Sequence, residues 1–206
     1  MDADRKAAKE AVKNMPRGQR IKYYIGYYKI HALVTVVLLI AVALFIRTML
    51  THQTSVMYFG TMNSERIDEQ YLNTAMKEVL GLGEKEKITV HKDLSSLPVY
   101  GEQDKVSLYL AVDQLNVVFS DEEGVKFMVD SEACLQMKYW CDMENYPKWK
   151  DRVYSYNGYD VAIDISGLPI MEKLVLEDDI KYILVTAKAG NEEYIKLFLD
   201  WVYEME

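Results

Sequence analysis

An apolar run near the amino end constrains this chain more than any other feature. Residues 30–46 carry no formal charge. With Arg47 and the next three residues the span 30–50 is about 20 residues long, the length needed to cross ~30 Å of hydrocarbon. A buried core helix would have a polar stripe at helical period, and this run has none. We therefore expect a transmembrane helix over residues 30–50.

A cleavable signal peptide is the alternative interpretation of this run. Such a peptide has a short basic segment before its apolar core and small residues at a cleavage site after it. Here the preceding segment is residues 1–29, and the following sequence RTMLTHQTS contains no such site. The pattern favours a single permanent anchor between a cytoplasmic segment, 1–29, and a separate domain, 51–206.

Lys and Arg are distributed unevenly about the run. Residues 1–29 hold eight Lys/Arg against three Asp/Glu, a balance of +5, whereas residues 51–206 hold 15 against 29, a balance of −14. The positive-inside rule then places the amino terminus in the cytoplasm and the acidic domain outside the cell. So acidic a domain argues against a nucleic-acid partner, because a nucleic-acid binder needs cations to displace phosphate counterions.

Aromatic and basic side chains border the run. Four tyrosines form two i,i+4 pairs directly before it, and tyrosine rings are enriched at the depth of the lipid headgroups. A partner-binding helix face is the alternative role for these rings. The predicted membrane-interface residues are Tyr23, Tyr24, Tyr27, Tyr28, Lys29 and Arg47.

Beyond residue 50, short apolar runs alternate with amphipathic helical patterns. This order predicts an α/β domain with a mostly parallel or mixed sheet flanked by helices. The aromatic-rich segment 133–158 has no clear period and is expected to be a helix or loop that feeds a strand. Strands are expected at 55–59, 87–91, 117–119, 159–166 and 182–186, and helices at 64–83, 104–116 and 191–205, the last with Asn191 as its N-cap.

The stretch after the predicted strand 117–119 is a candidate ligand site. Open α/β sheets bind ligands at the carboxyl ends of their strands, and helix N-termini favour anions, which nominates Ser120 and Asp121. The same letters, Ser-Asp-Glu-Glu, also form an S-x-x-E capping box with Ser120 as the cap. Three carboxylates beside it would repel an anion, so the cap is the favoured interpretation.

Two tryptophans give a second candidate. Trp140 and Trp149 could form a stacking platform for a sugar or peptide, or they could pack in the core, which is the commoner use of aromatic rings. Acidic residues such as Asp160 and Asp164 lack a nearby His or a nucleophile motif, so we expect no enzyme activity, and a hydrolase is only the third hypothesis. The sequence shows no metal or cofactor motif.

Cys134 and Cys141 are the two cysteines of the chain. They form no CxxC motif, and the three histidines are scattered, so neither a zinc site nor a thioredoxin-type redox site is predicted. A disulfide between them is allowed if the domain is extracytoplasmic, and two partly buried thiols are the alternative.

The stretch LYLAVDQLNVVFSDEEGVKFM resembles the helix, strand and turn of extracellular solute-binding proteins. The whole layout, with a basic tyrosine-rich start, one span and MYFGTMNSE after it, resembles uncharacterised single-pass membrane proteins of Gram-positive anaerobes whose external domains are similar to one lobe of such proteins. The resemblance implies an extracytoplasmic binding module for a small solute or a protein. It implies no particular ligand residues, and residues 51–206 suffice for only one lobe.

Together these features predict a membrane-anchored binding or interaction module. The bilayer is its first expected partner, and a small solute or another membrane or extracellular protein is the second. An accessory subunit of a membrane complex, acting through its anchor and its tyrosines, is the alternative function.

Overall fold

The computed structural model describes residues 12–13, 15–94, 105–141, 147–190 and 192–205. The chain forms two compact units, Met1–His52 and Gln53–Glu206. One sequence prediction, the cap Asn191, lies outside the described residues.

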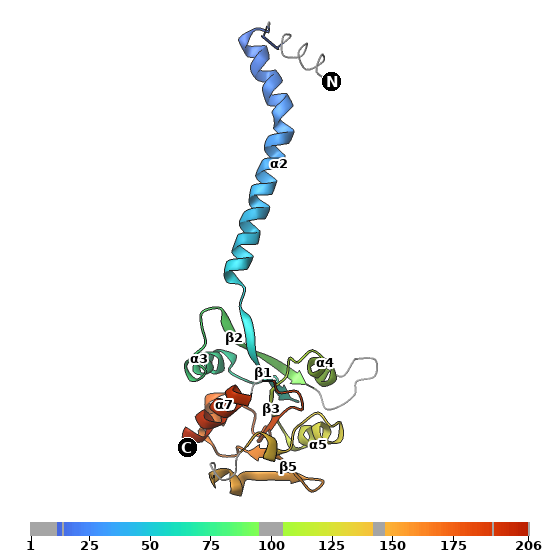
Figure 1. Cartoon of the computed structure of the whole chain (residues 1–206), viewed down its shortest axis with the longest axis vertical. Coiled ribbons are helices and arrows are strands. Elements are labelled where there is room, and N and C mark those ends of the chain that lie inside the picture. Colours follow the sequence, from blue (N-terminus) through green and yellow to red (C-terminus); the bar gives the residue numbers. More distant parts are fainter. Residues whose placement is uncertain (1–11, 14, 95–104, 142–146, 191, 206) are drawn as a thin grey trace. The chain divides into compact units, whose positions relative to one another are not determined.

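The first unit consists mainly of helix α2, which runs from Arg17 to Thr51 (Figure 1). Its segment Tyr28–Thr51 is long and apolar enough to cross a membrane. Large apolar side chains along this segment are exposed, among them Leu33 at 65% and Leu50 at 67%. The predicted apolar helix is therefore confirmed.

The residues predicted for the membrane interface all lie on α2. The rings of Tyr24 and Tyr28 stack with their centroids 6.0 Å apart, so this i,i+4 pair makes the contact that the spacing predicted. Tyr23, Lys29 and Arg47 are exposed, whereas the side chain of Tyr27 lies outside the described part of the structure. This surface combines aromatic rings with cations.

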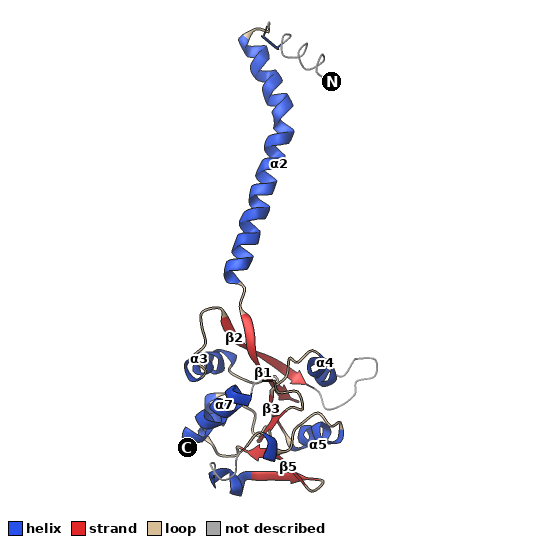
Figure 2. Ribbon diagram, viewed as in Figure 1, coloured by secondary structure: helices blue, strands red, loops and turns tan. Residues whose placement is uncertain are grey.

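The second unit is built on a six-stranded sheet with the order β2-β1-β3-β6-β5-β4. Strand β1 pairs in parallel with β2 and with β3, and the other three pairings are antiparallel, so the sheet is mixed (Figure 2). The strands are β1 Thr54–Met62, β2 Glu86–Leu94, β3 Val117–Ser120, β4 Val153–Tyr156, β5 Tyr159–Asp164 and β6 Tyr182–Val185.

Helices cover both faces of this sheet, and each face has its own buried core. The larger core lies under α3 (Glu69–Val79), α6 (Pro169–Lys173) and α7 (Glu192–Glu204). The smaller one lies under α4 (Lys105–Ala111) and α5 (Glu122–Asp130). Two short 3-10 helices, Met137–Tyr139 and Pro147–Arg152, lead into β4, which agrees with the prediction of a helix or loop that feeds a strand.

Three phenylalanines tie the sheet to α7 in the larger core. Phe59 on β1, Phe119 on β3 and Phe198 on α7 are fully buried. The centroid of the Phe198 ring lies 5.1 Å from that of Phe59 and 6.2 Å from that of Phe119, both with edge-to-face geometry. Such pairs add about 0.5–1.5 kcal/mol each beyond the burial of their area. Phe59 and Phe119 thus give the face of the sheet on which the last helix packs its Phe198 ring.

The antiparallel half of the sheet comes from a hairpin that the pattern at 133–158 did not predict. Strands β4 and β5 are joined by Asn157 and Gly158, whose φ angles are 52° and 80°. Positive φ at both central residues is the geometry of a two-residue type I′ turn, for which Asn-Gly is the preferred sequence. Of the two predicted forms, mostly parallel or mixed, the sheet is therefore the mixed one, and its parallel part consists of β2, β1 and β3.

Gly124 in the first turn of α5 allows this helix to approach β1 closely. A Cβ atom at this position would lie 2.9 Å from the Cβ atom of Met62 and nearer still to the Ser120 hydroxyl. Gly-to-Ala changes in helices ordinarily stabilise by about 0.5–1 kcal/mol, whereas overpacking costs about 1–3 kcal/mol. Only a glycine therefore fits at this position without displacing the strand or the helix.

We predict that Gly124→Ala destabilises the protein by about 1–3 kcal/mol although the site is helical. Urea unfolding of the full chain measures the change. Gly83→Ala is the matched control, because its new Cβ atom would meet Glu86 at an ordinary 3.6 Å, and it should change stability by less than about 0.5 kcal/mol. Equal effects of the two changes would contradict this account.

Candidate functional site

The carboxyl ends of β1 and β3 are the first place to look for a site. The chain moves from β1 to β2 on one side and returns to β3 on the other, so the strand order reverses between β1 and β3. Open α/β sheets bind ligands outside such a switch point. Here Asn63 and Asp121 follow the two strand ends, and the Asn63 amide nitrogen donates to both carboxylate oxygens of Asp121 at 3.1 and 3.0 Å.

Asp121 also caps helix α5, because its carboxylate accepts a hydrogen bond from the Gly124 backbone nitrogen at 2.8 Å. The cap is thus one residue later than the capping box predicted. Ser120 is instead the last residue of β3, fully buried, and its hydroxyl donates to the Asp121 backbone oxygen at 3.0 Å. The two residues nominated for ligand binding thus make hydrogen bonds within the protein, Ser120 to the Asp121 backbone and the Asp121 carboxylate to Asn63 and Gly124.

Both tryptophans belong to the larger core. Trp140 is 4% exposed and Trp149 is 2% exposed. The Trp140 indole nitrogen donates to the Leu135 carbonyl oxygen at 3.2 Å, and the Trp149 ring packs edge-on against Tyr203. A stacking platform needs an open ring face, and both rings are buried, so in this structure the favoured interpretation, packing in the core, describes them.

The cysteines and acids likewise have local roles. Cys134 and Cys141 are present as thiols, and burial raises the pKa of Cys134 to about 11, which keeps it protonated and unreactive at neutral pH. Asp164 accepts a hydrogen bond from the Ser166 backbone nitrogen, and Asp160 accepts one from Ser155. Among the residues that the structure describes, no three His, Cys, Asp or Glu side chains gather as metal ligands would.

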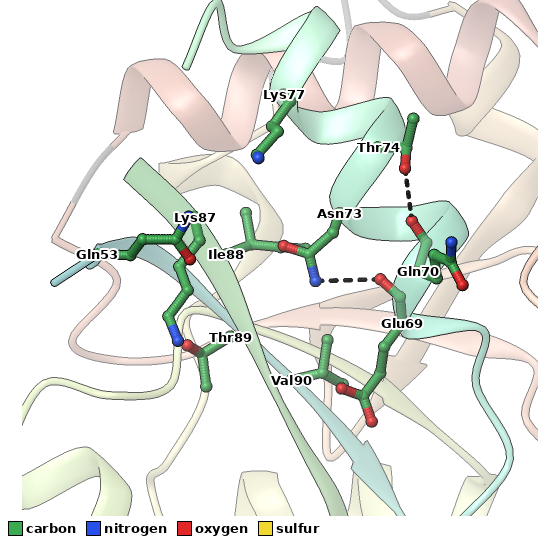
Figure 3. Close-up of a pocket in the computed structure, with 10 residues that line it drawn as sticks. All are labelled: Gln53, Glu69, Gln70, Asn73, Thr74, Lys77, Lys87, Ile88, Thr89 and Val90. Atoms are coloured by element: carbon green, nitrogen blue, oxygen red, sulfur yellow. Dashed lines mark hydrogen bonds between the residues drawn. The ribbon is translucent and has the colours of Figure 1, made fainter. Parts of the chain in front are cut away.

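A groove of about 460 Å³ lies between helix α3 and strand β2 (Figure 3). Its volume falls within the ~300–1,000 Å³ of ordinary ligand sites. Sequence reasoning missed it, because its walls come from two elements whose polar sides look like ordinary solvated surface. The groove is lined by Gln53, Glu69, Gln70, Asn73, Thr74, Lys77, Lys87, Ile88, Thr89 and Val90.

One wall of the groove is the outer edge of β2. The lining includes four consecutive residues of this strand, from Lys87 to Val90. Successive side chains of a strand point to opposite faces, so a groove that touches four in a row lies along the edge of the strand. Within the described residues β2 pairs only with β1. The edge facing the groove therefore presents backbone N–H and C=O groups with no neighbouring strand.

The other wall is the polar side of α3. Asp68 caps this helix by accepting a hydrogen bond from the Tyr71 backbone nitrogen at 2.9 Å, while Leu72 and Met76 anchor its opposite side in the larger core. The lining residues of α3 recur at i and i+4, which places them on one side of the helix. The buried residues Leu72 and Met76 and the cap Asp68 thus hold α3 so that its polar side faces β2.

Positive charge dominates the groove. The Glu69 carboxylate is 2.7 Å from the Lys92 ammonium group, so this acid is neutralised. No ion pair is described for Lys77 or Lys87, which lie on opposite walls. These two lysines belong to a domain in which residues 51–206 carry a balance of −14. The groove is suited to negatively charged groups.

His91 supports β2 from the face away from the groove. Its ring lies between Tyr109 of α4, at 3.8 Å between centroids, and Tyr58 of β1, at 6.0 Å, nearly parallel to both. Its Nε2 atom is buried and has no hydrogen-bond partner among the described residues. Burial lowers the pKa of His91 from its ordinary 6.5, and a hydrogen bond with the Gln114 backbone only partly offsets this. A neutral imidazole therefore holds the edge strand against α4.

Neither the sequence nor the structure matches a known family model, a curated protein or a solved structure.

The stack at His91 predicts a loss of stability in mild acid. The unfolded chain takes up a proton on His91 near pH 6.5, whereas the folded chain does so only at lower pH, so acid favours unfolding. Stability should fall as pH drops from above 6.5 through the lower pKa of the folded state. His91→Phe keeps an aromatic ring and cannot titrate, so we expect it to reduce this fall.

Urea unfolding of the full chain at about pH 7.5 and about pH 5.5 measures the effect. The exposed His52 lies outside the stack, and His52→Gln is the control that should leave the pH dependence as it is in the unchanged protein. An identical pH dependence in His91→Phe and the unchanged protein would show that His91 is not the group responsible.

Proposed function

We propose that this protein is a membrane-anchored interaction module whose α/β domain binds a partner on the extracytoplasmic side through the groove between α3 and β2. The observation that carries the proposal is the groove itself, since it combines two lysines without a described ion pair and a strand, β2, that pairs only with β1 among the described residues. Binding needs no catalytic group, and the acids and cysteines described above serve local structure.

The anchor in this proposal is helix α2. The segment Tyr28–Thr51 has the length and composition of a span. Tyr24 and Tyr28, stacked before the apolar run, suit the headgroup region, and Arg47 can extend its charged end to the opposite interface. The excess of Lys and Arg in residues 1–29 supports a cytoplasmic amino terminus and an external domain.

A partner fits the groove better than a solute in a closed cleft. A solute-binding protein surrounds its ligand at the carboxyl ends of its strands, and here Asn63, Asp121 and Gly124 occupy that position with hydrogen bonds to one another. The groove instead opens along the side of the sheet. Recognition there uses a strand edge and a helix wall, as in domains that bind segments of other proteins.

Site-specific photo-cross-linking tests this function. We expect a photoreactive amino acid at Thr74, exposed on the groove wall, to attach covalently to a partner in the native membrane. The same group at Lys196, exposed on α7, is the control and should give no adduct of that size. Equal adducts at both positions, or none at Thr74, would contradict the proposed use of the groove.

Cysteine labelling tests the orientation. Lys188→Cys in an exposed turn should react with a membrane-impermeant maleimide on intact cells, whereas Gly18→Cys near the start of α2 should react only after permeabilisation. The unchanged protein gives the background from Cys134 and Cys141. The opposite pattern of labelling would place the acidic domain in the cytoplasm and refute the extracytoplasmic role.

A further inference from the structure

We propose that the groove binds an extended acidic segment of a partner protein, which adds to β2 as a seventh strand of the sheet. This inference rests on the proposed function and names the chemistry of its partner. It combines three observations: a strand edge that pairs with no second strand among the described residues, a helix wall across the groove from it, and two lysines without a described ion pair.

The dimensions of the two walls fit an extended chain. The lining stretch Lys87–Val90 of β2 is about 10–13 Å long at ~3.3 Å per residue. The facing stretch of α3, from Glu69 to Lys77, is about 12 Å long at 1.5 Å per residue. Matching walls of this length hold roughly four residues of a strand. The volume of about 460 Å³ lies beside the strand edge, where such a strand would pair.

Backbone hydrogen bonds supply the part of the recognition that does not depend on the sequence of the bound segment. A strand next to β2 would satisfy the N–H and C=O groups that point away from β1, as in other complexes formed by strand addition. Ile88 is 2% exposed and Val90 is half-buried, so both face the larger core and leave the edge backbone accessible. Thr89 is held by a 2.6 Å contact between its hydroxyl and that of Ser55, which keeps the edge in extended geometry.

Lys77 and Lys87 supply the part of the recognition that selects acidic segments. They lie on opposite walls, so two neighbouring acids of a bound strand, whose side chains point to opposite faces, can each approach one lysine. The Lys92–Glu69 pair closes one end of the groove with no net charge. A segment with acids at adjacent positions therefore complements the groove better than a neutral or basic one.

A second copy of this chain is a poorer occupant. Pairing β2 with β2 would bring Lys77 and Lys87 of both molecules to one interface, and like charges at an interface oppose association. A small anion could reach the lysines, but it would leave the strand edge without a partner. A protein segment uses both features.

The test uses the full chain in detergent and a labelled, terminally blocked peptide of about seven residues. The peptide is rich in Val and Thr and has two adjacent glutamates at its centre. We expect it to bind at least about tenfold more tightly than a version with lysines in their place. Lys77→Glu with Lys87→Glu should reverse this preference, while the matched pair Lys188→Glu with Lys196→Glu, outside the groove, should leave it unchanged.

Backbone methylation separates strand addition from charge attraction. A strand added at one edge of a sheet uses alternate N–H groups, so N-methylation of one alternating set should abolish binding and methylation of the other should be tolerated. Equal binding of both methylated peptides would overturn strand addition, as would equal binding of the acidic and basic peptides. Unchanged far-ultraviolet circular dichroism of the lysine variants confirms that they fold.

The remaining outcomes distinguish the two proposals. If no peptide binds and the cross-link at Thr74 still forms, the inference of an added acidic strand is wrong, while the proposal that the groove binds a partner stands. If the cross-link also fails, the proposed function is wrong. Sedimentation of the full chain detects the rival occupant: a dimer that dissociates on Lys77→Glu with Lys87→Glu would assign the groove to a second copy and overturn the inference.

Discussion

The parallel pairing of β1 with strands on both of its sides determines the rest of the α/β domain. Because β1 lies between β2 and β3, its backbone groups are satisfied within the sheet and its side chains reach both cores. Phe59 meets Phe119 and Phe198 on one face, and Met62 meets Gly124 and α5 on the other. With β1 central, β2 has only one neighbour and becomes the outer strand. The candidate site exists because of that position.

The hydrogen bonds between Asn63 and Asp121 also follow from the central position of β1 in the sheet. The carboxyl ends of β1 and β3 are adjacent, which brings Asn63 within hydrogen-bond distance of the carboxylate that caps α5. Asn63 adopts a φ of 53°, a left-handed conformation that Asn tolerates better than most residues. The carboxylate therefore receives a helix N–H and a side-chain amide at the ends of these two strands. The recognition that we propose for this domain uses the strand edge instead.

Local sequence patterns were sufficient for elements whose signal is short-range. The apolar runs at 55–59, 117–119 and 182–186 predicted β1, β3 and β6, because strands buried on both faces carry continuous apolar side chains. The short helix α6 and the antiparallel hairpin were not predicted, although Asn157-Gly158 is a strong turn signal in the printed sequence. The cap was misplaced by one residue since Ser120 and Asp121 are both good N-caps, and only the length of β3 selects between them.

The candidate site could not be predicted from local sequence patterns, because it depends on how a helix and a strand pack against each other. Lys77 and Lys87 are ten positions apart on a helix and a strand, and nothing in either stretch shows that their polar sides face each other. That relation depends on the angle of α3 over the sheet, which Leu72 and Met76 help to set by packing in the larger core. The tryptophans illustrate the converse. Their size attracted a functional hypothesis, while burial at 4% and 2% exposure assigns them to the core.

The lysines of β2 have two physical effects that act together. An open strand edge invites association with any extended chain, and charged side chains on the edge are a common protection against it. Lys87 and Lys92 supply such charges, and the register shifts between β1 and β2 bend the edge further from a flat template. Protection by cations is selective, however, because lysine side chains repel basic strands and attract acidic ones. The same residues that oppose edge-to-edge aggregation would therefore favour the acidic segment proposed for the groove.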